Sequence, residues 1–285
     1  RLQNTDSILV LDDNFLYIKE YEKKSIAIIK ELEEYSNILN SDLNSIVDFY
    51  IDLLLDESIS NDKEKILKDI FKNIIDEIEL KMAKKEGKIE VLINNAGIGI
   101  GGPIEFSSLE DIDNQMDTNF MGCVRCTKAV LPYMREVNCG KIICLSSIGG
   151  LIGLPYQGFY SASKFAIEGF CQALRLECSQ FNIKVVVINP GDFSTHFTQN
   201  RKSQLSEDAS SAYPSLKASM KSIENDENGG LKPLKLAKVI AKIVEKRSPK
   251  YRYIIASPLQ KLAVVAKRIL PPRLFSWILK MYYKV

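Results

Sequence analysis

Glycine and proline are both absent from residues 1–86, although the 285-residue chain holds 15 glycines and 10 prolines. A dinucleotide-binding fold needs glycines after its first strand, because the backbone there turns tightly and approaches a pyrophosphate at a helix N-terminus. The absence excludes a glycine-rich phosphate loop from this part of the chain. Any pyrophosphate bound by this chain would therefore lack its main cradle, and we expect its affinity to fall by several orders of magnitude.

Other scarce features narrow the class of protein further. The single histidine, His196, excludes Ser/His/Asp hydrolysis unless it is the base, and we expect it at the surface. No cluster of His, Cys, Asp or Glu has the spacing of metal ligands, so we expect no metal. Cys123 and Cys126 have Cys-x-x-Cys spacing but lack a second pair. The six cysteines suit a reducing compartment.

Long apolar runs are missing too. None reaches the ~18 to 20 residues that a membrane span needs, and no stretch has the pattern of a signal peptide. With the cysteine content, this predicts a cytoplasmic protein. Composition is otherwise that of a soluble globular chain, long enough for one large α/β domain or for one domain with a small appendage.

Charge is distributed unevenly along the chain. Residues 1–86 carry a net charge of −8, and residues 87–285 carry +10. From Lys246 onward there are ten Lys or Arg and no Asp or Glu, interleaved with aromatic residues. One interpretation is a basic amphipathic tail that makes peripheral contact with an anionic membrane. The other is a strand and helices that close a substrate site or pack on a neighbouring subunit. No nucleic-acid motif accompanies the charge, so we expect no nucleic-acid partner.

The second part of the chain, residues 87–285, alternates strands with helices. Apolar runs predict strands at Glu90–Asn94, Lys141–Ser146, Lys184–Asn189 and Tyr251–Ala256. Helical patterns fill the gaps at Leu109–Arg135, Phe159–Phe181 and Leu234–Lys246. This alternation predicts an α/β fold, a Rossmann-like doubly wound parallel sheet with helices on both faces.

Two segments do not fit this alternation. Residues 191–230 form a long polar stretch without clear periodicity, and loops of this length are usually functional lids or disordered segments. In a substrate lid, Phe193, Phe197 and Tyr213 would give the segment an apolar inner face. Residues 1–86 are an atypical, mostly helical portion that begins with an apolar run, Ser7–Leu11. Helical patterns follow at Asn14–Glu34, Ser45–Leu55 and Lys63–Lys85, although Tyr50–Leu55 can also be read as a strand. The remaining segment, 246–285, is the basic tail.

Tyr160 and Lys164 form the pattern with the clearest chemistry, and Ser147 lies thirteen residues upstream. A tyrosine has a pKa near ~10, so it acts as a base near neutral pH only beside a cation. Lys164 is one helical turn away at i+4. Lowering the pKa by roughly three units needs about 4 kcal/mol, which an ammonium in a partly desolvated site supplies. A serine hydroxyl nearby can donate to the substrate oxygen.

Several further motifs accompany this pair in order. Asn94-Asn95-Ala96-Gly97 ends one predicted strand, Asn119 lies in the following helix, Ser146-Ser147 end the next strand, and Pro190-Gly191 end another. With Tyr160-x-x-x-Lys164, this series resembles the short-chain dehydrogenase/reductase family, over roughly residues 87–255. The loops near Ser147 and Pro190 are most similar to the hydroxysteroid and retinol dehydrogenase branch. The family's Thr-Gly-x-x-x-Gly-x-Gly element is missing.

The resemblance implies a role for each matching residue. Tyr160 would be the proton donor and acceptor, Lys164 would lower its pKa and bind the nicotinamide ribose, Ser147 would polarise the substrate oxygen, and Asn119 would anchor a water that relays protons. The cofactor, NADP or NAD, would contact the following residues: Asn94, Ala96, Gly97, Tyr160, Lys164, Pro190, Gly191 and Thr195. The choice between the two cofactors cannot be read from residues 87–285. The resemblance further implies a homodimer or homotetramer.

Three hypotheses for function remain open at this point. The first is an NAD(P)-dependent oxidoreductase that moves a hydride between nicotinamide and a small apolar secondary alcohol or ketone. The second, prompted by the missing glycine loop, is a non-catalytic relative that binds a ligand or partner. The third is a fragment that cannot bind cofactor and associates through an exposed sheet edge.

Overall fold

The computed structural model describes residues 8–11, 89–195, 197, 201–203 and 205–285. The chain divides into two units, one of Arg1–Asp13 with Lys88–Val285 and one of Asn14–Gly87. The second unit lies outside the described residues, as do His196 and the three predicted N-terminal helices with their alternative strand. The predicted boundary between residues 1–86 and 87–285 therefore stays a prediction.

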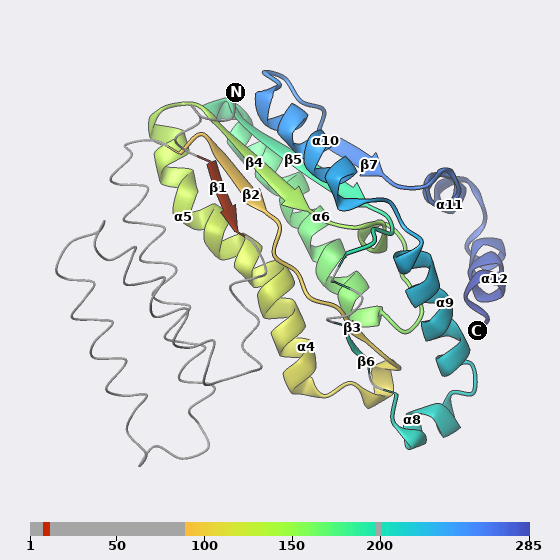
Figure 1. Ribbon diagram of the computed structural model, residues 1–285. Helices are drawn as coiled ribbons and strands as arrows, with labels where there is room; N and C mark the ends of the chain where they lie inside the picture. The colour runs from red at the N-terminus through yellow and green to blue at the C-terminus, as the bar shows by residue number, and fades with distance from the viewer. Residues whose placement is uncertain (1–7, 12–88, 196, 198–200, 204) are drawn as a thin grey trace, which may run out of the picture. The chain divides into compact units, whose positions relative to one another are not determined.

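A parallel sheet forms the centre of the described unit (Figure 1). Its strands, in spatial order, are β1 (Ile8–Leu11), β2 (Val91–Asn94), β4 (Gly140–Leu145), β5 (Ile183–Pro190) and β7 (Arg252–Ile255). The four strands predicted after residue 87 are thus confirmed to within about two residues, the usual uncertainty of element ends. The apolar run at Ser7–Leu11 supplies β1, which pairs in parallel with β2. A separate two-stranded sheet joins β3 (Ile100–Gly101) to β6 (Lys202–Ser203).

Helices cover both faces of the sheet, which explains why β4 is buried along its whole length. Successive side chains of a strand point to opposite faces. Ile143 and Leu145 pack in one cluster with Ile243 of α10 (Pro233–Glu245). Cys144, between them, points the other way, and its Sγ lies 3.6 Å from that of Cys123 on α5 (Gly122–Glu136). The predicted doubly wound α/β fold is confirmed.

A buried lysine ties α10 to the sheet. The Lys141 ammonium at the start of β4 donates to the carbonyl oxygens of Ile243 and Lys246, at 3.0 Å each, and to that of Val244. These carbonyls end the helix, where no further N–H group is available within it. Burial lowers the pKa of Lys141. The Lys141 ammonium thus caps the C-terminus of α10 from the side of the sheet.

The predicted helix Leu109–Arg135 is present but not regular. It consists of α4 (Leu109–Met116), a π-helical turn η3 (Asp117–Met121) and α5. Ser108 caps its N-terminus by accepting from the Asp111 N–H at 3.1 Å. The π-helical turn contains Asn119, whose side chain is buried. Such single turns are rare and occur frequently at functional sites.

The predicted helix Phe159–Phe181 also forms, as α6 (Gly158–Cys178) followed by a short 3-10 turn η5 (Ser179–Phe181). α6 packs against β5, on the face of the sheet that α5 covers. Its first turns carry Tyr160 and Lys164. A further 3-10 turn, η4 (Ile148–Gly150), follows β4 and lies against α6.

Residues 191–230 are more regular than their polar sequence predicts, and the expectation of a stretch without periodicity is wrong. The segment contains α8 (Glu207–Ala212) and α9 (Leu216–Asn228). Ser206 caps α8 by accepting from the Ala209 N–H at 3.1 Å. In α9, Leu216, Met220 and Ile223 repeat at helical spacing and are buried. Because only three positions of that helix carry large apolar side chains, its period is hidden among polar residues.

The basic segment 246–285 folds into β7, α11 (Pro258–Ile269) and α12 (Pro272–Tyr283). Each helix has proline at its first position, where no intrahelical N–H bond is lost. Ser257 and Gln260 form a capping box at the start of α11. Among the described residues, no helix has both the length and the apolar character to cross a membrane.

Candidate active site

The predicted site residues meet at the carboxyl edge of the sheet. Asn94 ends β2, Ser147 follows β4, and Pro190 ends β5, with Gly191 directly after it. The carboxyl ends of parallel strands share one edge, and ligands of open α/β sheets bind there. Tyr160 and Lys164 reach this edge from the first two turns of α6.

Ser147 is held from two sides. Its side-chain oxygen accepts from the Gly149 N–H at 3.0 Å and so caps the turn η4. Its carbonyl accepts from Asn189 Nδ2 at 2.9 Å. A Cβ on Gly149 would lie 3.2 Å from the Tyr160 ring, so the glycine lets this turn approach the ring closely. The arrangement keeps the serine hydroxyl beside the tyrosine.

The acidity of Tyr160 reflects several opposing effects. Burial is the largest effect and the charge of Glu227 adds to it, whereas a hydrogen bond from Ser147 acts in the opposite direction. Together with the smaller effects, they raise the pKa of the phenol to about 12. The ring of Phe197 lies 5.7 Å from the Tyr160 ring, centre to centre, and helps to remove it from water. The phenol is therefore protonated at neutral pH in this structure.

Lys164 is buried one turn further along α6. Its ammonium donates to the Leu145 carbonyl at 3.1 Å and lies 5.8 Å from the centre of the Tyr160 ring. The pKa of Tyr160 is raised overall, because desolvation of the phenol outweighs the opposing effects of the Ser147 hydrogen bond and the Arg201 charge. The predicted lowering of this pKa by Lys164 stays a prediction.

Asn119 connects three elements. Its Oδ1 accepts from the Ile98 N–H at 2.7 Å, and its Nδ2 donates to the Ile98 carbonyl and to Ser163 Oγ, both at 3.0 Å. Ser163 Oγ in turn donates to the Tyr160 carbonyl at 2.7 Å. Gln115 also donates to the Ile98 carbonyl, at 3.2 Å. Asn119 thus fixes the loop after β2 against the first turn of α6, and its predicted role in a water relay stays a prediction.

Two further predicted cofactor residues form side-chain hydrogen bonds to groups other than Ser147, Tyr160 and Lys164. Asn94 Nδ2 donates to Thr127 Oγ1 at 3.2 Å and to Cys144 Sγ at 3.4 Å, away from Tyr160. Ala96 lies in the loop between β2 and β3. Thr195 is exposed, and its Oγ1 accepts from the Phe197 N–H at 3.2 Å.

These residues fit one half of a nicotinamide dinucleotide. A Cβ on Gly97 would lie 3.0 Å from the Lys164 ammonium, and one on Gly191 would lie 2.8 Å from Ala256 Cβ, so both glycines keep the backbone close to the site. Asn94 Oδ1 is buried and has no hydrogen-bond partner among the described residues. The described residues therefore offer a nicotinamide dinucleotide a buried lysine and an unused acceptor, and ribose binding by Lys164 stays a prediction.

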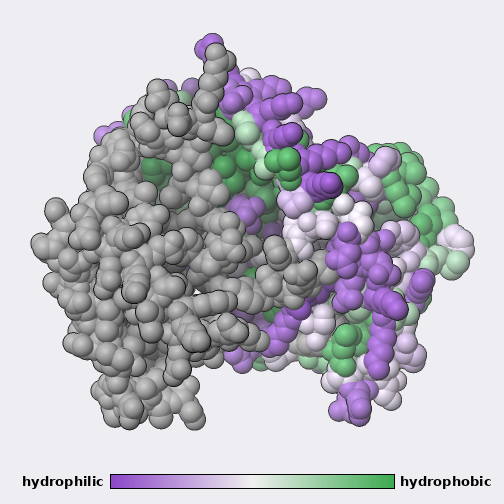
Figure 2. All heavy atoms as spheres, viewed as in Figure 1, coloured by the Kyte–Doolittle hydropathy of each residue, from purple (hydrophilic) through white to green (hydrophobic). Residues whose placement is uncertain are grey.

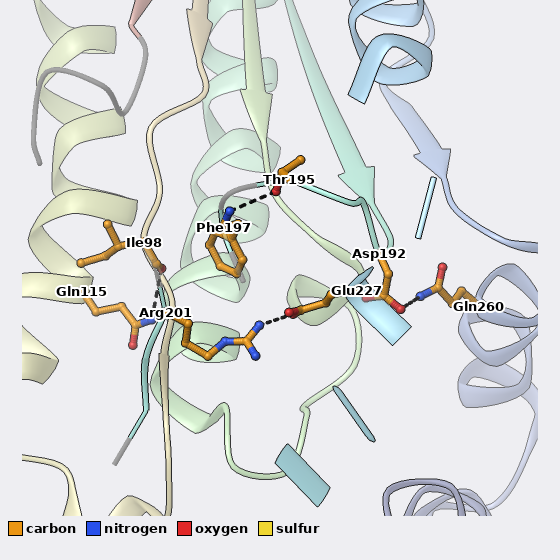
Figure 3. A network of polar contacts seen from close by, with 8 residues as sticks. All are labelled: Ile98, Gln115, Asp192, Thr195, Phe197, Arg201, Glu227 and Gln260. Atoms are coloured by element: carbon orange, nitrogen blue, oxygen red, sulfur yellow. Dashed lines mark hydrogen bonds and ion pairs between the residues drawn. The ribbon is translucent and has the colours of Figure 1, made fainter. Parts of the chain in front are cut away.

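A charged network of Glu227, Arg201 and Asp192 affects the pKa of Tyr160 and was not predicted from sequence. Figure 3 shows these three residues. Arg201 forms a buried ion pair with Glu227 of α9. Its guanidinium also lies 5.7 Å from the centre of the Phe197 ring. Arg201 Nη1 is buried without a hydrogen-bond partner among the described residues. No local signal marks this pair, because the two residues are 26 positions apart.

Asp192 extends this network toward the C-terminal helices. It accepts a hydrogen bond from Gln260 of α11 (Figure 3). The pKa of the Asp192 carboxyl is raised to about 6, mainly by burial and also by the negative charge of Glu227. Its position directly after Pro190-Gly191 is the one sequence signal that could have drawn attention to it.

Within the part of the chain that the structure describes, no group of three His, Cys, Asp or Glu side chains could hold a metal ion. Cys123 and Cys126 do not form a disulfide with each other. Cys123 instead lies against Cys144, and burial and hydrogen bonding to that thiol raise its pKa.

Comparison with known proteins agrees with this geometry. The family profile for short chain dehydrogenases matches residues 67–206. A 3-ketodihydrosphingosine reductase of Bacteroides thetaiotaomicron is 47% identical over 202 residues, which cover 70% of this chain and 75% of the reductase. Retinol dehydrogenase 8 of Bos taurus is 39% identical over 58% of this chain and 55% of its own length. The chain thus spans only about half of that second relative.

Solved structures share the fold. A short-chain dehydrogenase from Streptomyces avermitilis superposes with a TM-score of 0.62 at 24% identity, covering 69% of this chain and 70% of that one. An ElxO variant with NADPH bound has a TM-score of 0.51 at 29% identity, covering 64% of this chain and 71% of that one. A short chain dehydrogenase/reductase from Burkholderia phymatum in complex with NAD has a TM-score of 0.55 at 21% identity, covering 67% of this chain and 70% of that one.

The ElxO variant holds NADPH, which supports the predicted cofactor, NADP or NAD, without choosing between the two. The sheet, the site at its carboxyl edge and the similarity to the reductase agree. The chain belongs to the short-chain dehydrogenase/reductase family, whose similar members are NAD(P)-dependent oxidoreductases, as the sequence motifs predict.

Proposed function

We propose that this chain reduces a ketone on an apolar molecule to a secondary alcohol. The observation that carries the proposal is the meeting of Ser147, Tyr160 and Lys164 at one edge of the sheet, with the serine hydroxyl bonded to the phenol. A bound nicotinamide would supply the hydride, and the residues of the chain would orient the substrate and move the proton.

Each residue then has a defined task. Ser147 donates to the substrate oxygen and holds it in line with Tyr160. Tyr160 gives its phenolic proton to the developing alkoxide. Lys164 binds the nicotinamide ribose, and Asn119 holds the Ile98 loop against the start of α6. The proton lost by the phenol returns from solvent, by way of the relay predicted for Asn119.

The acidity of Tyr160 favours reduction over oxidation. A phenol with a pKa of about 12 carries its proton throughout the neutral range and can donate it. Alcohol oxidation requires the phenolate, which is scarce at neutral pH under these conditions.

An apolar substrate is supported by the residues between Ser147 and Tyr160. Ile148 and Ile152 are buried in a cluster that Leu151 and Leu154 extend. Tyr156 packs edge to face with Tyr213 at 6.3 Å, so the lid segment contacts this loop. The similar reductase is named for a ketone on a dihydrosphingosine, and retinol dehydrogenase 8 for retinol. A molecule with an extended apolar body is the substrate class that we propose.

The first experiment is a direct measurement of NADH and NADPH binding by calorimetry. Wild-type protein is compared with Tyr160→Phe, which removes the proton donor but little of the binding surface. The proposal requires micromolar binding by both proteins, with turnover of a long-chain ketone by the wild type alone. Such binding would mean that another part of the chain replaces the missing glycine-rich cradle. No binding up to millimolar cofactor would overturn the proposal.

The absence of glycine from residues 1–86 favours one alternative, a relative that binds an apolar ligand without turnover. The same calorimetry separates the two functions, because this alternative predicts ligand binding with no affinity for either cofactor.

The expected homodimer or homotetramer is a proposal too. Phe165 and Leu176 on α6 are 41% and 73% exposed, which suits an interface through this helix. Light scattering of the wild type and of Leu176→Asp tests it, and a monomeric wild type would contradict it. The cytoplasmic location stays a prediction, to be tested by cell fractionation.

A further inference from the structure

α11 presents an apolar stripe that nothing in the described structure covers. Leu259, Leu262, Val265 and Ile269 are spaced by three or four residues and therefore lie on one side of the helix. All four are exposed, at 49% to 74%. The opposite side packs into the molecule through Val264, which is buried.

α12 repeats this arrangement. Its exposed apolar residues are Leu274, Trp277, Ile278 and Met281, again at helical spacing, while Phe275 points inward and is buried. Ten of the eighteen exposed large hydrophobic side chains in the described part of the chain lie between Leu259 and Val285. Figure 2 shows hydrophobic residues gathered over this end of the molecule. Large exposed apolar patches rimmed by polar residues mark interaction sites on soluble proteins.

Positive charge accompanies both stripes. The exposed basic residues of this region are Lys261, Lys267, Arg268, Arg273, Lys280 and Lys284, and no acidic residue follows Glu245. Arg273 and Lys280 are seven positions apart, so they lie on one side of α12, next to Trp277. Lys267 is engaged with the Leu151 carbonyl. Within the described residues, none of the six forms an ion pair.

We propose that α11 and α12 together form a docking surface for an anionic phospholipid bilayer, with both helices lying in the plane of its interface. A helix with an apolar face flanked by Lys and Arg binds there through buried apolar area and attraction to anionic lipids. A second copy of this chain would instead bring two such basic surfaces together. Charge complementarity therefore favours the anionic bilayer.

The surface adjoins the candidate site. Tyr282 of α12 donates to Asp226 of α9 at 3.0 Å, and the next residue of α9 is Glu227, the partner of Arg201. Gln260 of α11 donates to Asp192. A bilayer at this surface would lie beside the lid segment, where an apolar substrate would enter. The docking itself does not depend on the proposed activity.

Trp277 provides the measurement, since it is the only tryptophan of the chain and is 59% exposed. The full-length protein is titrated with vesicles of phosphatidylcholine alone and of phosphatidylcholine with phosphatidylserine. We expect the anionic vesicles to shift the Trp277 emission to shorter wavelength, to protect it from iodide and to carry the protein upward in flotation. High salt should weaken the binding.

Two pairs of variants separate the contributions. Met281→Asp should weaken partitioning, whereas Leu234→Asp, at an equally exposed position on α10, should leave it unchanged. The double variant Arg273→Glu with Lys280→Glu should lower the partition coefficient onto anionic vesicles at least about 25-fold, because each basic residue near the surface contributes about fivefold. Lys235→Glu with Lys242→Glu, which has the same spacing on α10, is the matched control.

Three outcomes would overturn the proposal. One is that the Trp277 emission shifts with neither the phosphatidylcholine vesicles nor the vesicles that contain phosphatidylserine. Another is an equal loss of binding in the α10 controls, which would indicate a nonspecific charge effect. The last is a protein-concentration-dependent shift without lipid that vesicles do not alter, which would assign the surface to a second copy of the chain.

Discussion

The ammonium of Lys164 lies 5.8 Å from the centre of the Tyr160 ring and donates to the Leu145 carbonyl at 3.1 Å. Tyr160 nevertheless has a pKa raised to about 12, because burial has a larger effect than the charges around it. The phenol therefore keeps its proton at neutral pH, which the proposed role of proton donor requires.

A pH profile tests this directly. Because the phenol keeps its proton below pH 12, we expect kcat/KM for ketone reduction to be nearly constant between about pH 6 and pH 9. Alcohol oxidation needs the phenolate and should rise about tenfold per pH unit over the same range. A plateau of the oxidation rate near pH 7 would instead show that Lys164 lowers the pKa once cofactor is bound.

Phe197→Ala should make Tyr160 more acidic. The Phe197 ring lies 5.7 Å from the tyrosine ring and also lies against Gly99, so its removal admits water to the phenol. We expect the oxidation profile to move about one unit toward lower pH. Phe106→Ala, which removes a ring that packs on Tyr213 instead, is the control and should leave the profile in place. An unchanged profile in Phe197→Ala would assign the burial to other groups.

Arg201→Met should destabilise the fold by about 3 kcal/mol, because it leaves the Glu227 carboxylate buried without its cation. Combining it with Glu227→Gln should recover part of the loss. Arg125→Met breaks the more exposed pair with Asp117 and should cost under about 1 kcal/mol. Urea unfolding followed by circular dichroism measures all of these variants. Equal losses in Arg201→Met and Arg125→Met would contradict the burial of the first pair.

Asp192→Asn should change how stability depends on pH. The unfolded carboxyl loses its proton near pH 3.8, whereas the folded one keeps it up to about pH 6. The folded state thus binds the proton more tightly, and wild-type stability should fall as the pH rises through this window. Asp192→Asn should remove that decline, and Asp208→Asn on α8 should retain it. Urea midpoints measured from pH 3.5 to pH 7 make the comparison, and parallel curves for wild type and Asp192→Asn would refute the assignment.

Local sequence patterns were sufficient for the strands and for most helices after residue 87. Continuous apolar runs such as Ile142–Leu145 mark strands buried on both faces, and this signal needs no knowledge of the partner strand. α9 escaped prediction because only Leu216, Met220 and Ile223 carry its period, within a polar segment. The π-helical turn around Asn119 escaped as well, since its sequence continues an ordinary helical pattern.

The sequence by itself determined that Tyr160 and Lys164 share one side of a helix, because four residues make about one turn. It also determined that Ser147 and Pro190 end neighbouring parallel strands and so lie at one edge. Only the tertiary structure decided that Phe197 covers Tyr160 and that Arg201 meets Glu227 beside it. These contacts join distant parts of the chain, and the pKa of Tyr160 follows from the burial they create rather than from its neighbours in sequence.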